Sequence, residues 1–186
     1  MPTLDLEPQV SADDGHSNEF PLFQTTNIGL FAGTDANGDD TAFFCRFPNV
    51  TIPPGATIDV AYLTFEFYLY GGSPLTNIFF NASDDATAPT DRASHVAKAR
   101  TTAFTPYDGV FVAQSDSIVA PVQEVIDRPL WVSGNAMMAL HDDDGSPTNV
   151  FVGFASFDHI TLDPPILHIE YSLGSPIIAW IQDDMG

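Results

Sequence analysis

The chain has 186 residues, long enough for one domain with a substantial core, and 44% of them are hydrophobic, which is typical of a folded protein. Its charge is strongly unbalanced, because 25 Asp and Glu residues face only 5 Lys and Arg residues and the formal net charge is −20. Phosphate binding needs clustered basic side chains and anionic membranes repel such a chain, so we expect neither nucleic acid nor membrane as a partner.

The first twenty or so residues are polar, and the sequence places them outside the core of the fold. They hold neither a basic region nor an apolar run, so we expect no signal peptide. No segment reaches the roughly 18 apolar residues of a membrane span. The expected location is therefore a cytoplasm, or a larger particle assembled there.

Short alternating segments separated by turn residues predict an all-β fold, an antiparallel, jelly-roll-like β-sandwich. The longest alternating segment covers residues 57–70, which we expect to form one strand. The other expected strands cover residues 27–31, 41–47, 76–82, 109–113, 136–141, 149–154 and 166–171. The only cysteine, Cys45, falls in an apolar strand and is expected to be buried.

One segment, residues 115–128, has the period of a helix instead. Its apolar stripe consists of Ile118, Val119, Val122, Val125 and Ile126. A proline follows the segment and ends it. We expect this short helix to cover one end of the sandwich with Trp131 buried against it, although a docking helix has the same pattern.

The chain divides into a sandwich domain, residues 1–172, and a C-terminal arm, residues 173–186. The arm is apolar at Ile177, Ile178, Trp180 and Ile181, although the strand before it already closes the sandwich. Large apolar side chains gain free energy by burial, so we expect these four residues to dock on a partner. The alternative is an arm that folds back on its own sandwich.

Several segments together resemble a known protein module. They are FPNVTIPPGATIDVAYLTF (47–65), NASDDATAP (81–89), RTTAF (100–104), VQEVIDRPLWVSGNAMMAL (122–140) and PPILHIEYS (164–172). This pattern resembles a jelly-roll-like β-sandwich module of large bacterial surface and secreted proteins. The resemblance implies an adhesive or architectural role and supplies no catalytic residues. A standalone acidic copy with an arm resembles the capsid decoration (cement) or tail accessory proteins of tailed phages.

Acidic turns are the first candidates for chemistry. Asp35, Asn37 and Asp39 alternate along a turn as the ligands of a calcium loop do, but aspartate and asparagine also favour turns for their backbone hydrogen bonds. The five histidines form no HxxxH or HxH pair, which argues against zinc. They are His16, His95, His141, His159 and His168. We expect no cofactor and no metal.

The sequence gives little support for catalysis. Serine hydrolases need a nucleophile elbow, which this chain lacks, and with 25 acids a suitably spaced carboxylate pair carries no information. Five aromatic residues offer either a sugar-binding platform or part of the core. They are Tyr62, Tyr68, Tyr70, Phe79 and Phe80.

The expected function is that of a non-enzymatic virion structural protein, specifically a decoration protein on the outside of a phage head. The expected partners are the major capsid protein or another virion protein and further copies of this chain, with a homotrimer expected from the same resemblance. The alternative is a carbohydrate-binding, lectin-like adhesion module, such as one of a tail fibre, which a solvent-facing pair of aromatics in a groove would favour.

Overall fold

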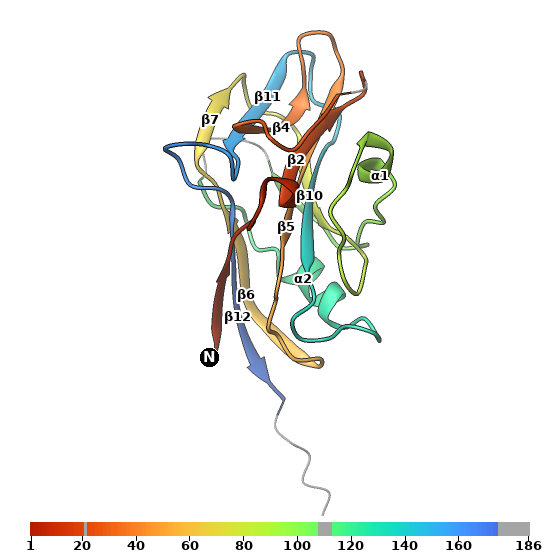
Figure 1. The fold of residues 1–186 in the computed structure, drawn as a ribbon, viewed down its shortest axis with the longest axis vertical. Helices are drawn as coiled ribbons and strands as arrows, with labels where there is room; N and C mark the ends of the chain where they lie inside the picture. The colour runs from red at the N-terminus through yellow and green to blue at the C-terminus, as the bar shows by residue number, and fades with distance from the viewer. Residues whose placement is uncertain (21, 108–112, 175–186) are drawn as a thin grey trace, which may run out of the picture.

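The strands form two antiparallel sheets that face each other, as the sequence predicts (Figure 1). A computed structural model describes residues 1–20, 22–107 and 113–174. The smaller sheet has the order β1-β12-β6 and consists of β1 (Thr3–Leu6), β12 (Ile166–Leu173) and β6 (Ala56–Thr64). The fold is therefore an all-β antiparallel sandwich, and its helices are short.

The larger sheet has nine described strands, seven of them in the order β7-β11-β4-β5-β10-β8-β9. These seven are β7 (Phe67–Tyr70), β11 (Val150–Ala155), β4 (Gly29–Thr34), β5 (Asp40–Phe47), β10 (Met137–Asp143), β8 (Thr76–Phe80) and β9 (Thr105–Tyr107). The other two are β2 (Asp14–Asn18), which pairs with β5, and β3 (Phe23–Gln24), which pairs with β2. The expected strand over residues 109–113 falls almost entirely outside the described residues.

The long alternating segment, residues 57–70, forms two strands rather than the expected one. β6 belongs to the small sheet and β7 to the large one, and they are separated by Phe65 and Glu66. A bulge also interrupts β6, because Glu170 pairs with Val60 whereas the next residue of β12 pairs with Ile58. The bulge moves the buried side chains of β6 from even-numbered to odd-numbered positions. A strict two-residue alternation does not predict this change.

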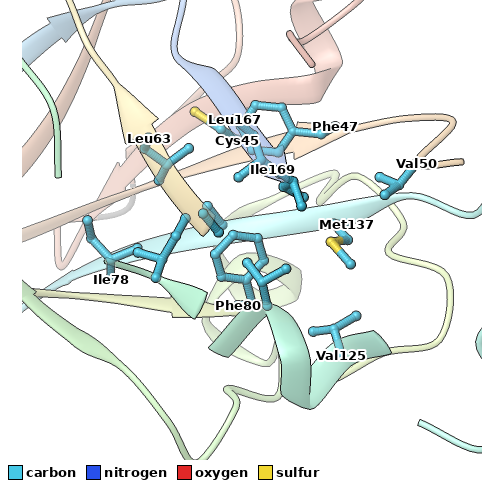
Figure 2. Close-up of a cluster of buried hydrophobic side chains, with 14 of the residues drawn as sticks. Cys45, Phe47, Val50, Leu63, Ile78, Phe80, Val125, Met137, Leu167 and Ile169 are labelled. Carbon is cyan, nitrogen blue, oxygen red and sulfur yellow. The ribbon is translucent and has the colours of Figure 1, made fainter. Parts of the chain in front are cut away.

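The core lies between the two sheets and is closed at one end by a helix (Figure 2). Leu63, Leu167 and Ile169 of the small sheet lie within it, together with Phe47 and Phe80 of the large one. The close-up labels further members of the same cluster, which are Cys45, Val50, Ile78, Val125 and Met137. The expected burial of Cys45 is confirmed.

The expected helix is present as α2 (Val119–Ile126), shorter than predicted. Val122 and Val125 on its inner face are fully buried, and so is Trp131, whose Nε1 donates a hydrogen bond to the carbonyl of Ile52 at 3.0 Å. The predicted shared burial of the helix stripe and Trp131 is confirmed. A second short helix, α1 (Arg92–Val96), was not predicted.

The N-terminal segment is part of the fold, contrary to the prediction. β1 pairs with β12 along its whole length, and β2 pairs with β5. The polar run of β2 is buried because it lies in the large sheet, where backbone pairing rather than hydrophobicity holds it. The spacing of apolar residues could not predict the pairing of β2 with β5, since the side chains of β2 are polar on both faces.

Candidate ligand-binding site

A hollow of about 300 Å³ opens where two strands diverge from a third. Thr41 of β5 pairs with Asn18 of β2 and also with Gly33 of β4, so both strands start from one point and then separate. The hollow lies in this fork. Its lining residues are His16, Asn18, Leu22, Gln24, Asn27, Phe31, Asp35, Thr41, Leu69 and Phe151.

In the apolar wall of the hollow, each phenylalanine of one strand lies opposite a glycine of the neighbouring strand. Phe31 of β4 pairs with Gly153 of β11, and Gly33 of β4 pairs with Phe151 of β11. The two rings are half-buried, and their centroids lie 6.2 Å apart at an angle of 67°. A phenylalanine opposite a glycine lies across the bare backbone, so both rings spread over the sheet and line the hollow.

Further glycines leave the space that these rings occupy. A Cβ atom at Gly71 would stand 2.5 Å from a ring carbon of Phe151, so only glycine fits there without displacing the ring. Leu69 of β7 pairs with Gly153 from the other side and extends the wall. This arrangement makes an open apolar surface on a sheet whose other face fills the core.

The opposite wall carries side-chain amides. Asn27 donates from Nδ2 to Oε1 of Gln24 at 2.6 Å and accepts the amide of Gly29 at 3.1 Å. Asn18 accepts the amide of Leu22 at 3.3 Å through Oδ1. These bonds orient Gln24 and Asn18 so that their amide nitrogens, which the described hydrogen bonds leave unused, are available to a ligand.

Asp35 supplies the carboxylate of the hollow. Its Oδ1 accepts the amides of Asn37 at 2.7 Å and Asp39 at 3.1 Å, which is the hydrogen bonding of an aspartate in a turn. Across the described residues, no three His, Cys, Asp or Glu side chains are grouped so that they could hold a metal ion. The observed bonds therefore account for the acidic turn as turn chemistry.

His16 lies deepest among the polar lining residues, at 3% exposure. Its ring meets the ring of Phe31 edge-on, with centroids 5.0 Å apart, and Nδ1 is buried without a hydrogen-bond partner. Burial lowers the pKa of His16 to about 4, although a hydrogen bond with the backbone of Gly29 opposes the shift. The imidazole is therefore neutral near pH 7 and presents an unused nitrogen.

The five aromatics for which the sequence left open a platform or a place in the core do not share a face. Phe80 is in the core, Phe79 packs against Phe104, and Tyr62 stacks on His168 in the small sheet at 4.5 Å. Tyr68 and Tyr70 lie on β7, and the ring of Tyr68 meets that of Phe31 near the hollow. The rings that line the hollow are Phe31 and Phe151. The sequence signal for them was the spacing of Phe and Gly two residues apart in two strands.

Two other histidines are buried as neutral structural groups. Nδ1 of His95 lies 2.9 Å from Oγ of Ser17, and Nε2 of His141 lies 2.7 Å from Oγ1 of Thr76. Burial lowers the pKa of His95 to about 4 and that of His141 to about 3. Both Ser17 and His95 are almost inaccessible to solvent, so the pair holds α1 against β2 rather than meeting a substrate.

A buried acidic cluster lies beside the site, at the start of β2. Oδ2 of Asp14 accepts the amide of Phe157 at 2.7 Å, and Oγ of Ser11 donates to Oδ1 of Asp158 at 2.9 Å. The remaining oxygens, Oδ1 of Asp14 and Oδ2 of Asp158, are buried without partners. Burial raises the pKa of Asp14 to about 7, helped by the charges of Asp158 and Asp13. The adjacent Arg46 is bound to Asp13 at 2.6 Å.

The predicted docking residues Ile177, Ile178, Trp180 and Ile181 lie outside the described residues. Within residues 1–20, 22–107 and 113–174, no helix is both long and apolar enough to cross a membrane.

Comparison with models of known protein families and with curated proteins finds no match for this chain.

Proposed function

We propose that this protein is a non-catalytic recognition module that binds carbohydrate in the hollow between β2 and β4. The observation that carries the proposal is the pairing of an apolar wall, Phe31 and Phe151, with amide and imidazole groups on the opposite side. Small-molecule sites combine apolar lining with a few polar groups in this way, and a volume of about 300 Å³ suits a small ligand or the end of a glycan.

Sugars fit this combination because a pyranose ring has hydroxyl groups around its edge and C–H groups on its faces. The face of an aromatic ring carries partial negative charge and attracts polarised C–H groups. The hydroxyls need donors and acceptors, which the amides of Asn18 and Gln24 and the ring of His16 supply.

A glycan array followed by calorimetry tests the proposal. We expect at least one glycan to bind the protein, and Phe151→Ala to weaken that binding about tenfold or more, as for loss of a central aromatic contact. Phe104→Ala is the matched control, because Phe104 is also partly exposed, at 47%, but lies away from the hollow against Phe79. Equal losses in the two variants would reject the hollow as the site.

We also propose, from the sequence resemblance, that the module acts on a virion surface as a decoration protein bound to a capsid protein. An apolar patch favours docking near one end of the sandwich: Leu130 is 71% exposed and Val132 is 57% exposed, in the segment between α2 and β10. That segment lies towards the same end of the molecule as the end of β12 (Figure 1). Exposed apolar patches are typical of interaction sites.

Mass spectrometry of purified phage particles tests this second proposal. We expect the protein in the particle, and loss of particle binding in Leu130→Ser/Val132→Ser while the folded monomer is retained. Sedimentation of the isolated protein tests the expected homotrimer separately. A protein that is absent from purified particles would refute the virion assignment and leave the carbohydrate proposal intact.

A further inference from the structure

Each of the three buried histidines has one ring nitrogen without a partner among the described residues, and that of His16 belongs to a side chain that lines the hollow. Buried polar atoms are nearly always hydrogen-bonded, and an unpaired one costs free energy. Nδ1 of His16 has no partner among the described residues, and the side chain lines the hollow at 3% exposure. Because Nδ1 itself has less than 1 Å² of accessible surface, a ligand that donates a hydrogen bond to it has to displace part of the lining at the floor of the hollow.

The charge of the hollow restricts the ligand further. Among the described residues that line it, Asp35 is the one with a charge, and none is a lysine or arginine. The imidazole of His16 is neutral near pH 7, because burial lowers its pKa to about 4. An anionic sugar would therefore meet a carboxylate without any compensating positive charge, on a protein whose formal net charge is −20.

We propose that the hollow selects neutral sugars, with a pyranose ring lying by its face on one of the inclined rings of Phe31 and Phe151 and by its edge on the other, and with one hydroxyl donating a hydrogen bond to Nδ1 of His16. This inference rests on the proposed function and adds the ligand class and the residue that recognises it. His16 touches the ligand and determines specificity, since a site with a buried acceptor rejects an analogue that lacks the donor.

The partners of His16 position it for this role. The edge-on contact with Phe31 packs the imidazole against the apolar wall, and the backbone of Gly29 lies close to it. The same ring that forms the apolar wall therefore also fixes the acceptor. The charged lining residue Asp35 is engaged at Oδ1 by the amides of its own turn.

Calorimetric titration with neutral glucose, galactose and mannose oligosaccharides, and with glucuronic acid and sialic acid oligosaccharides, tests the inference. We expect a neutral sugar to bind and the acidic sugars to bind at least tenfold more weakly. His16→Phe keeps a ring but removes the acceptor, and should weaken binding about 10- to 100-fold, the cost of one buried hydrogen bond. His16→Asn, which places an oxygen near the position of Nδ1, should restore part of that loss.

A readout on the wild-type protein makes the test independent of the variants' folding. The ¹⁵N resonance of Nδ1 of His16 should shift when the neutral sugar is added, and binding should weaken as the pH falls towards 4. Sugar binding with no preference against acidic sugars, or without a shift of Nδ1, would overturn this inference and leave the proposed function standing. Failure of every sugar to bind would overturn both.

Discussion

The ring of Phe31 lies directly over Gly153 on the neighbouring strand, so closely that a Cβ atom at Gly153 would stand 2.7 Å from the ring carbon Cε1. The glycine and the phenylalanine therefore form one structural unit that sets the position of the apolar wall. A side chain at position 153 would displace the ring, which also contacts His16.

Gly153→Ala should consequently weaken both the fold and the site. We expect a loss of about 1–3 kcal/mol in the free energy of unfolding, which is typical of overpacking, and a loss of glycan binding larger than that stability change explains. Denaturant unfolding and calorimetry measure the two quantities. The matched control is Gly174→Ala, because a Cβ atom at Gly174 meets nothing within 4 Å. Unchanged binding in Gly153→Ala would show that the ring position is unimportant.

The three buried histidines make the fold sensitive to acid. Burial lowers the pKa values of His16 and His95 to about 4 and that of His141 to about 3, whereas the unfolded chain titrates near 6.5. Below pH 6.5 the unfolded state therefore binds more protons, and stability present above this pH is lost as the pH falls towards 4. Each histidine contributes a slope of up to about 1.4 kcal/mol per pH unit.

Urea unfolding between pH 7.5 and 4.5 measures this slope. His95→Asn keeps a polar atom near Oγ of Ser17 but cannot titrate, so its stability should fall less steeply than that of the wild type. Identical slopes for the two proteins would contradict the assignment of His95 as a neutral buried group.

Asp14 has the opposite pH dependence. Its pKa is raised to about 7 in the folded protein from an ordinary value of 3.8, mainly by burial, so the folded state binds the proton more tightly. The stabilisation is fully present below pH 3.8 and is lost as the pH rises through about 7.

Asp14→Asn should therefore stabilise the protein over the wild type more at pH 8 than at pH 5, because the variant keeps an acceptor for the amide of Phe157 and buries no charge. Unfolding curves of the variant and the wild type at both pH values measure the change. Asp144→Asn removes the same charge at an exposed position and serves as the control. A variant less stable than the wild type at pH 8 would show that the charged form of Asp14 is the stabilising one.

Trp131 fixes the end of the sandwich beneath α2. Trp131→Phe removes the hydrogen bond from Nε1 to the carbonyl of Ile52 and leaves a buried acceptor unpaired, for a cost of about 1–3 kcal/mol. The neighbouring Leu130→Ala, at a residue 71% exposed, should stay within about 0.5 kcal/mol of the wild type. Thermal unfolding of both variants gives the comparison, and equal stabilities would contradict the structural role of the indole.

The features of the fold that could be predicted from the sequence are those that depend on the regular spacing of apolar side chains. The strands β5, β8, β10, β11 and β12 and the helix α2 follow the period of their apolar side chains closely enough for sequence analysis to find them. β1 and β2 were missed because their position depends on backbone pairing with β12 and β5, which polar side chains do not encode. The split of residues 57–70 was missed because the alternation of side chains continues through Phe65 and Glu66, where the chain passes from the small sheet to the large one.

The candidate site was harder to predict, because its parts are far apart in the chain. Phe31, Phe151 and His16 come from three strands, and only their pairing with neighbouring strands brings them together. The spacing of Phe31 with Gly33 and of Phe151 with Gly153 was visible, but its meaning depends on the antiparallel register that places each phenylalanine opposite a glycine. The alternative of an aromatic platform does not hold for the same reason, since its five residues belong to different sheets.

Chemical-shift mapping of the ¹⁵N-labelled protein during titration with a neutral glycan tests the central claim most directly. We predict that the largest changes fall on the amides around His16 in β2, Phe31 in β4 and Phe151 in β11, and that they disappear in Phe31→Leu/Phe151→Leu while Phe104→Ala keeps them. Saturable changes centred on another face, or changes that persist in the double variant, would contradict binding in the hollow.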